Sequence, residues 1–203
     1  MSLKKGLPFG SDSDALPWFT YPSIEFLDQL NFKGCDVFEY GSGNGTKYWA
    51  KHCHSVTSVE SDLEWFTRNS QQTLPNQVVL YRQGLINYVN SLESGPAPYD
   101  VIIIDGSWRY DCVVKSILMI KKGGLIILDN SDWHPNSCKF LRDGGWTQID
   151  FIGLGPINNY SWATSIFFKN YLAVPRRSNC DPIDAKASIK QLGETDQPGL
   201  KSS

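Results

Sequence analysis

The stretch VFEYGSGNGT at residues 37–46, with the short apolar run that follows and ends on Glu60, decides the fold. It starts as an apolar run that carries one acid, turns through glycines at 41, 43 and 45, and resumes as a helix from Thr46 to about His52. Glycines allow positive φ and close approach of a ligand to the backbone. An acid at the tip of a second strand, such as Glu60, can accept both hydroxyls of a ribose. The order of strand, glycine turn, helix, strand and acid predicts a nucleotide-binding βαβ unit.

The spacing of the glycines distinguishes between two kinds of nucleotide-binding site. A dinucleotide site requires G-x-G-x-x-G, and Thr46 occupies the position of the third glycine. The pattern here is instead E-x-G-x-G-x-G followed by a strand-end acid. It resembles motif I and the acidic loop of class I S-adenosylmethionine (SAM)-dependent methyltransferases. That resemblance implies that Glu39 faces the methionine ammonium group, that Glu60 binds the ribose, and that the turn contacts the cofactor through Gly41, Ser42, Gly43 and Gly45. A tight turn without a ligand is the alternative.

The remaining chain alternates between the two periodicities of strands and helices. Helices are predicted at 23–30, 62–70, 86–92, 111–120 and 138–141, and strands at 78–81, 101–104, 125–128, 146–152 and 162–168. The fully aliphatic runs before Asp105 and Asp129 are typical of parallel strands buried on both faces. The order resembles the class I methyltransferase fold over about residues 17–169. We therefore expect an α/β protein with a seven-stranded, mostly parallel, Rossmann-like sheet and a C-terminal antiparallel hairpin. The resemblance also implies that Gln83, Gly84 and Leu85 lie beside the adenine.

Composition divides the chain into three parts. Residues 1–16 are polar and glycine-rich, which predicts a flexible arm, and 17–170 form the methyltransferase-like domain. Residues 171–203 lose all periodicity, which predicts a disordered tail that orders only if it docks. The aromatic segment 17–22 either packs on the sheet edge or folds over the mouth of the cofactor site.

Charge and cysteine content limit the partners and the compartment. A net charge of −2 gives no general attraction for nucleic acid or an anionic membrane, so we expect neither as a partner. No apolar run approaches the ~20 residues of a bilayer span, and the first residues lack the apolar core of a secretory signal. Five scattered cysteines favour reduced thiols and a cytoplasmic protein. The oligomeric state is left open.

A second group of polar residues follows two aliphatic strands. Asp105, Asp129 and Asn130 are hard oxygen ligands at one sheet edge, which suits Mg²⁺. The pattern resembles metal-dependent O-methyltransferases of the catechol type and implies that these residues hold the metal. Trp108 occupies the position of the expected lysine base, and Arg109 follows it. The candidate catalytic residues are therefore Asp105, Arg109 and His134, of which Asp105 also borders the cofactor. In the alternative interpretation the acids cap loops and His134 is a surface histidine.

The loop at 153–162 is a candidate substrate loop. It offers amides, a phenol and an indole, a mixture suited to sugars or other polyhydroxyl acceptors, although a plain hairpin connection explains its glycines and proline equally well. We expect a SAM-dependent methyltransferase that acts on a small, hydroxylated acceptor, at oxygen rather than at carbon or nitrogen. The alternatives are a SAM- or nucleotide-binding protein without catalysis and an NAD-dependent oxidoreductase, which Thr46 disfavours.

Overall fold

A computed structural model describes residues 14–71, 73–175 and 177 of the chain. Its helices are α2 (Tyr21–Leu27), α3 (Asn44–His52), α4 (Leu63–Ser70), α5 (Leu85–Asn90), α6 (Arg109–Ser116) and α7 (Pro135–Asp143), with short 3₁₀ helices η1 (Ser91–Ser94) and η2 (Ser131–Trp133). Its strands are β1 (Asp36–Tyr40), β2 (Ser55–Glu60), β3 (Gln77–Tyr81), β4 (Tyr99–Ile104), β5 (Ile120–Asp129), β6 (Thr147–Gly153) and β7 (Trp162–Phe168).

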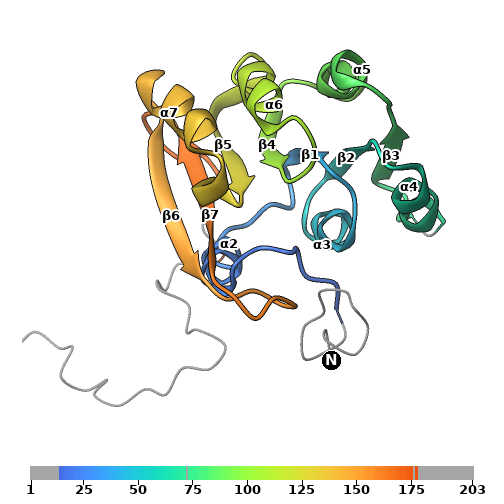
Figure 1. The fold of residues 1–203 in the computed structure, drawn as a ribbon, viewed down its shortest axis with the longest axis horizontal. Coiled ribbons are helices and arrows are strands. Elements are labelled where there is room, and N and C mark those ends of the chain that lie inside the picture. Colours follow the sequence, from blue (N-terminus) through green and yellow to red (C-terminus); the bar gives the residue numbers. More distant parts are fainter. Residues whose placement is uncertain (1–13, 72, 176, 178–203) are drawn as a thin grey trace, which may run out of the picture.

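All the strands form one seven-stranded sheet in the order β3-β2-β1-β4-β5-β7-β6 (Figure 1). Strands β1 to β5 run parallel, and β7 pairs antiparallel with both β5 and β6. This topology confirms the expected α/β class, including the C-terminal antiparallel hairpin. The chain leaves β1 toward β2 on one side and later returns to β4 on the other. Ligands of open α/β sheets bind at such a switch point, outside the carboxyl ends of the strands.

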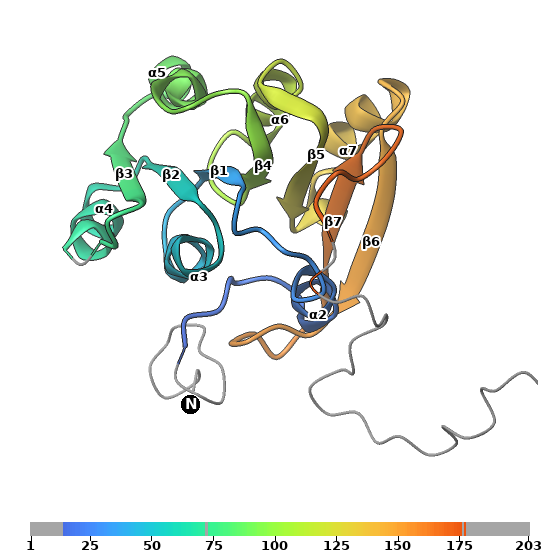
Figure 2. The same cartoon turned by 180° about the vertical axis from the view of Figure 1, so that it is seen from behind.

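Helices cover both faces of the sheet, as Figures 1 and 2 show from opposite sides. One face carries α2, α3 and α4, and the other carries α5, α6 and α7. The strands alternate accordingly: Val101 and Ile103 of β4 belong to one buried cluster, whereas Ile102 and Ile104 belong to the other. Because both faces are buried, β4 needs an unbroken aliphatic run, as the sequence predicted.

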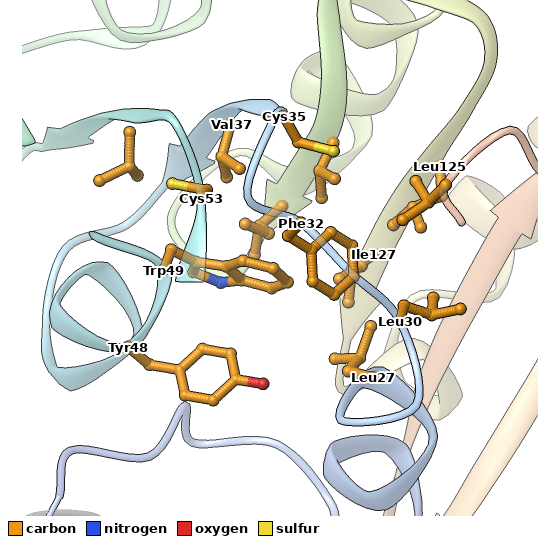
Figure 3. Packing of buried hydrophobic residues seen from close by; sticks show 14 of the residues in the cluster. Leu27, Leu30, Phe32, Cys35, Val37, Tyr48, Trp49, Cys53, Leu125 and Ile127 are labelled. Carbon is orange, nitrogen blue, oxygen red and sulfur yellow. The ribbon is translucent and has the colours of Figure 1, made fainter. Parts of the chain in front are cut away.

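The core under α2 and α3 is built around Trp49 (Figure 3). Its indole meets the ring of Phe32 edge-on, with centroids 5.1 Å apart, and Leu27 and Leu30 pack beside it. Each such buried side chain contributes roughly 1.5–3 kcal/mol through removal of apolar surface from water. Val174 joins the same cluster, so the packing extends beyond the boundary predicted at residue 170.

The start of the predicted tail is docked. The N–H of Ala173 donates to the carbonyl of Gly123 at 2.9 Å, and the N–H of Asn31 donates to the carbonyl of Pro175 at 2.8 Å. Residues 178–203 lie outside the described residues, as does most of the arm predicted at 1–16.

Two predicted helix boundaries are wrong, and both errors have a physical cause. Helix α6 ends at Ser116 rather than at 120, and the residues at 120–124 form the first part of β5. Lys121 is held there by Asp100 at 2.8 Å and Asp36 at 3.5 Å, the carboxylates of two neighbouring strands. Helix α2 begins at Tyr21 rather than at 23. Proline in its first turn is tolerated because the N–H it lacks would have no partner there.

The other predicted helix boundaries shift by one to three residues, and α2 ends at Leu27 rather than at 30. Helix α7 runs from Pro135 to Asp143 around the predicted 138–141 segment, and α5 begins at Leu85 and is continued by η1. Asp62 caps α4 by accepting the N–H of Trp65 at 2.7 Å.

The cysteines of the described residues are free thiols. All four are buried: Cys35, Cys53, Cys112 and Cys138. Burial raises the pKa of Cys35 to about 11. In the described part of the chain, every helix is too short or too polar to cross a membrane.

Candidate cofactor and acceptor site

A cavity of about 360 Å³ opens at the carboxyl ends of β1, β2, β4 and β5. Its volume lies within the range of small-molecule sites. Four groups of residues line it: the glycine turn and its acid, the ends of β2, β4 and β5, two aromatic residues near the chain start and on α4, and the loops after β5 and β6. They are Glu39, Gly41, Ser42, Gly43, Asn44 and Gly45; Glu60, Asp105, Gly106, Asp129 and Asn130; Trp18 and Trp65; Trp133, Asn158, Tyr160 and Trp162.

The glycine turn after β1 lies against the end of β4. Gly41 has φ +99°, and a Cβ there would stand 2.9 Å from the carbonyl oxygen of Asp105. Only glycine accommodates both the positive φ and this approach of two backbones. At Gly45 a Cβ would meet Oε1 of Glu39 at 2.5 Å. The turn therefore exposes its backbone to the cavity and holds the Glu39 carboxylate next to it.

Glu39 is buried, with 4% of its surface exposed. The hydroxyl of Thr46 donates to its Oε2 at 2.5 Å and accepts the N–H of Gly43 at 3.0 Å. Burial raises the pKa of Glu39 well above its ordinary value, an effect that the Thr46 hydrogen bond opposes. From the sequence, Thr46 was interpreted only as a departure from the dinucleotide pattern. Its hydroxyl in fact joins the turn to the acid.

Glu60 ties the turn to the start of α4. Its Oε2 accepts the N–H of Ser42 at 3.1 Å and the hydroxyl of the same residue at 3.2 Å. Its Oε1 accepts the N–H groups of Ser61 at 2.8 Å and Asp62 at 3.0 Å. Hydrogen bonds to a carboxylate are stronger than neutral ones. Glu60 thus lines the cavity with its carboxylate in a fixed orientation.

The strand-end residues Asp105, Asp129 and Asn130 all line the cavity, so the structure brings this predicted group together. Oδ1 of Asp129 accepts the indole N–H of Trp162 at 3.0 Å and the hydroxyl of Thr164 at 2.5 Å. Burial and the charge of Asp129 raise the pKa of Asp105, and burial also raises the pKa of Asp129. Two carboxylates in one desolvated place each disfavour ionisation of the other.

Arg109 connects the strand ends that line the cavity. It donates from Nη2 to Oδ1 of Asp105 at 3.2 Å, from Nε to the carbonyl of Gly106 at 3.0 Å, and from Nη1 to the carbonyl of Asp129. Its positive charge lowers the pKa of Asp105 against the effect of burial. Arg109 does not line the cavity, so its contact with a ligand would be indirect.

This arrangement does not suit a divalent cation. One oxygen of Asp105 and one of Asp129 already accept hydrogen bonds, and the guanidinium of Arg109 places a fixed positive charge beside both residues. Mg²⁺ and Ca²⁺ require several free oxygen ligands around one point. Residues 14–71, 73–175 and 177 contain no group of three or more His, Cys, Asp or Glu that could hold a metal. The predicted metal site stays a prediction that the side-chain contacts do not support.

Two other predicted elements lie apart from the cavity. His134 borders a second hollow, which shares Trp133 with the cavity and also includes Tyr110 and Lys139. Burial and the charge of Arg109 lower the pKa of His134. Gln83, Gly84 and Leu85 are exposed and absent from the cavity lining. The roles predicted for these four residues remain predictions.

Aromatic side chains form the outer walls. Trp18 comes from the predicted aromatic segment, whose next residue, Phe19, is buried in the core, so the segment both packs on the domain and reaches the cavity. Trp133 on η2 faces Tyr160 with ring centroids 6.4 Å apart, and Tyr160 lies 5.9 Å from Trp162. The predicted substrate loop at 153–162 therefore lines the cavity.

Trp65 and Trp133 were missed as cavity residues. The indole N–H of Trp65 donates to the carbonyl of Ser42 and so brings α4 onto the glycine turn. Trp65 falls within the helix predicted at 62–70, and no spacing of residues signals its contact with the turn.

Comparison of structures identifies the fold as that of class I methyltransferases. The described fold resembles a precorrin-6y C5,15-methyltransferase from Geobacter metallireducens GS-15, with a TM-score of 0.59 and 12% identity over 82% of this chain and 96% of the other. It also resembles an rRNA methylase from Streptococcus thermophilus, with a TM-score of 0.57 and 14% identity over 72% and 93% of the two chains. A third similar structure is the O-methyltransferase TomG from Streptomyces achromogenes, which is involved in tomaymycin synthesis and was solved with SAM (TM-score 0.56, 12% identity, 77% of each chain).

Sequence comparison adds nothing to this: no protein-family model and no curated protein matches the chain. The structural likeness therefore defines a fold, while the three similar proteins act on different acceptors.

Proposed function

We propose that this protein transfers a methyl group from SAM to a hydroxyl group of a small acceptor. The proposal rests on one observation. The glycine turn, the buried Glu39 and the strand-end Glu60 all line the same cavity. The fold supports it, because similar structures are methyltransferases. The charge of the cavity supports it too, since carboxylates favour a ligand that carries positive charge.

The residues present suit SAM. Gly41, Gly43 and Gly45 leave the backbone of the turn open to a ligand, and side chains at Gly41 and Gly45 would collide with Asp105 and Glu39. Glu39 would face the amino-acid end, and Glu60 would accept ribose hydroxyls in place of part of its present hydrogen bonds. When bound, SAM supplies an electrophilic methyl group on a positively charged sulfur.

Asp105 is the proton acceptor in this proposal. It lines the cavity next to Asn130 and Asp129, on the side where the aromatic loops begin. Its pKa is raised by burial and by Asp129, which makes its carboxylate a stronger base than an exposed one. The acceptor hydroxyl would give its proton to Asp105 as its oxygen takes the methyl group. Arg109 would hold Asp105 in place, and alignment of the acceptor would supply much of the rate.

Titration calorimetry with the purified chain tests the cofactor. SAM and its demethylated product should bind, and NAD should not. Binding of NAD without a response to SAM would overturn the proposal in favour of an oxidoreductase.

Turnover tests the reaction. With SAM and a panel of hydroxylated compounds, the demethylated cofactor should accumulate together with a methylated product. Tight SAM binding without turnover of any acceptor class, including phenols, amines, sugars and RNA, would contradict catalysis and favour a binding protein.

A further inference from the structure

We propose, on the basis of the methyl transfer argued above, that the acceptor is an uncharged sugar unit held against Trp133 and Tyr160. Acceptors that carry phosphate, nucleic acid included, are excluded from this cavity. Three properties of the cavity carry the proposal: exposed aromatic faces, neutral amides beside them, and a lining without basic side chains.

The aromatic walls of the cavity are open to solvent. Trp133 is 56% exposed, Tyr160 47% and Trp18 37%, although each is a large apolar side chain. They come from three distant segments, namely η2, the loop between β6 and β7, and the segment before α2, and they meet at one cavity. A concentration of exposed apolar surface marks a binding site. Flat aromatic faces pack well against the C–H face of a sugar ring, while the phenol of Tyr160 retains a hydrogen-bonding group.

The polar groups beside these walls are neutral and point to hydroxyl groups. The side-chain amide of Asn158 donates to the hydroxyl of Tyr160 at 2.9 Å, and the amide of Asn130 lines the same cavity. An amide offers both donors and acceptors, which matches a hydroxyl in either role. Asp129 is held by Trp162 and Thr164, so its carboxylate is partly occupied and is a weaker partner for an acceptor cation.

The charge of the lining excludes anions. Glu39, Glu60, Asp105 and Asp129 line the cavity, whereas no Lys, Arg or His is among its described lining residues. Lys121, Lys122 and Lys169 instead border a separate hollow around the start of β5, at the opposite end of the strand from Asp129. Arg109 already pairs with Asp105 at 3.2 Å and is not among the lining residues. A phosphate in the cavity would therefore face carboxylates with no free basic side chain in the described lining to offset them. Under the proposed function, the positively charged sulfur of SAM is the cation that the carboxylates bind. A neutral acceptor then fits the rest of the cavity best.

The first experiment gives the full chain SAM and a matched acceptor panel. The panel contains methyl glycosides of the common pyranose stereochemistries, the phosphate derivatives of the same sugars, a catechol, a primary amine and a structured RNA. We expect release of the demethylated cofactor with one or more glycosides and not with their phosphates or with RNA. The KM for the glycoside should not change with ionic strength, because salt screens only charged partners.

Variants of the aromatic wall supply the second readout. Trp133→Ala and Tyr160→Ala should each raise the KM for the glycoside about 3- to 10-fold through loss of ring stacking, with the affinity for SAM unchanged. Tyr171→Ala is the matched control, since Tyr171 is 49% exposed and absent from the cavity lining, and its KM should equal that of the parent.

Several outcomes would overturn the inference. Preference for a sugar phosphate, RNA, the amine or the catechol would do so, as would a KM unchanged by both aromatic variants. Turnover of no glycoside by a chain that binds SAM would reject the sugar and leave the methyltransferase proposal standing. Failure to bind SAM would instead reject the proposed function on which the inference depends.

Discussion

Arg109 donates to Asp105, four residues earlier in the chain, at 3.2 Å, and both side chains are mostly buried. The pair spans the turn from β4 into α6. The same guanidinium also binds the carbonyl of Asp129 at the end of β5. One cation thereby joins the carboxyl ends of two neighbouring strands and orients the carboxylate that faces the cavity. Because it favours the charged form of Asp105 against burial, it sets how strong a base this carboxylate can be.

The first prediction concerns this pair. Arg109→Met should raise the pKa of Asp105, since it removes the opposite charge while burial and Asp129 remain. Only the ionised form of Asp105 accepts a proton, so the acid limb of kcat/KM should move to higher pH. Arg109→Lys keeps a positive charge and should therefore show a smaller shift of the acid limb than Arg109→Met. The measurement is the pH profile of turnover with the best acceptor.

A control separates this effect from a general loss of charge. Arg142 is exposed near the end of α7 and donates to Gln148 at 2.5 Å, so Arg142→Met should leave the profile unchanged. An unshifted acid limb in Arg109→Met would show that Asp105 is not the proton acceptor.

Much of the fold was predictable because local patterns dictate it. The all-aliphatic run from Val101 to Ile104 requires burial on both faces, and such a strand needs parallel neighbours and covering helices. The acids that end β2, β4 and β5 reach the cavity because parallel strands end at the same edge. Gly41 was predictable as well, since a turn in which a Cβ would collide with the end of β4 requires glycine.

The remaining parts of the site depend on which segments meet in space. Trp133 and His134 are adjacent, and both border the hollow beside α7, but Trp133 also lines the main cavity and His134 does not. The turn that carries them begins with Asn130 in the left-handed region at φ 49°. No periodicity announces such a change of direction. Lys121 follows a helix that was predicted to end at 120, but two carboxylates on β1 and β4 hold it within a strand.

The second prediction concerns cofactor affinity. Glu60→Ala should weaken SAM binding about 10- to 100-fold, because the ribose loses hydrogen bonds to a charged group, worth roughly 1.5–3 kcal/mol. It should also lower stability, since the N–H groups of Ser42, Ser61 and Asp62 lose their acceptor. Calorimetric titration with SAM and urea unfolding measure the two effects. Glu64→Ala, at an exposed position in the next helix, is the matched control, and equal SAM affinity in both variants would contradict the assignment of Glu60.

The third prediction is the pH dependence of stability conferred by Glu39. Burial raises its pKa in the folded chain well above that in the unfolded chain. The unfolded chain ionises this carboxyl at its ordinary pKa while the folded chain keeps it protonated, so the destabilisation grows as pH rises above the unfolded-state pKa and levels off above the folded-state pKa. Glu39→Gln removes the ionisation and should therefore gain stability relative to the parent as pH increases from acidic to neutral. Unfolding curves without ligand measure it, and a difference that is independent of pH would show that Glu39 titrates normally.

The last prediction opposes two accounts of Asp129. If it holds an ion, chelation should abolish turnover and Mg²⁺ should restore it. We expect activity to persist in excess chelator, because Oδ1 of Asp129 is occupied by Trp162 and Thr164 and Arg109 adds a positive charge beside it. As a hydrogen-bond acceptor, Asp129 should also affect stability. Asp129→Ala leaves two buried donors without an acceptor and should cost about 1–3 kcal/mol for each, whereas Asp129→Asn keeps an acceptor oxygen and should unfold close to the parent in urea. Loss of activity on chelation, restored by Mg²⁺, would establish the metal-assisted alternative instead.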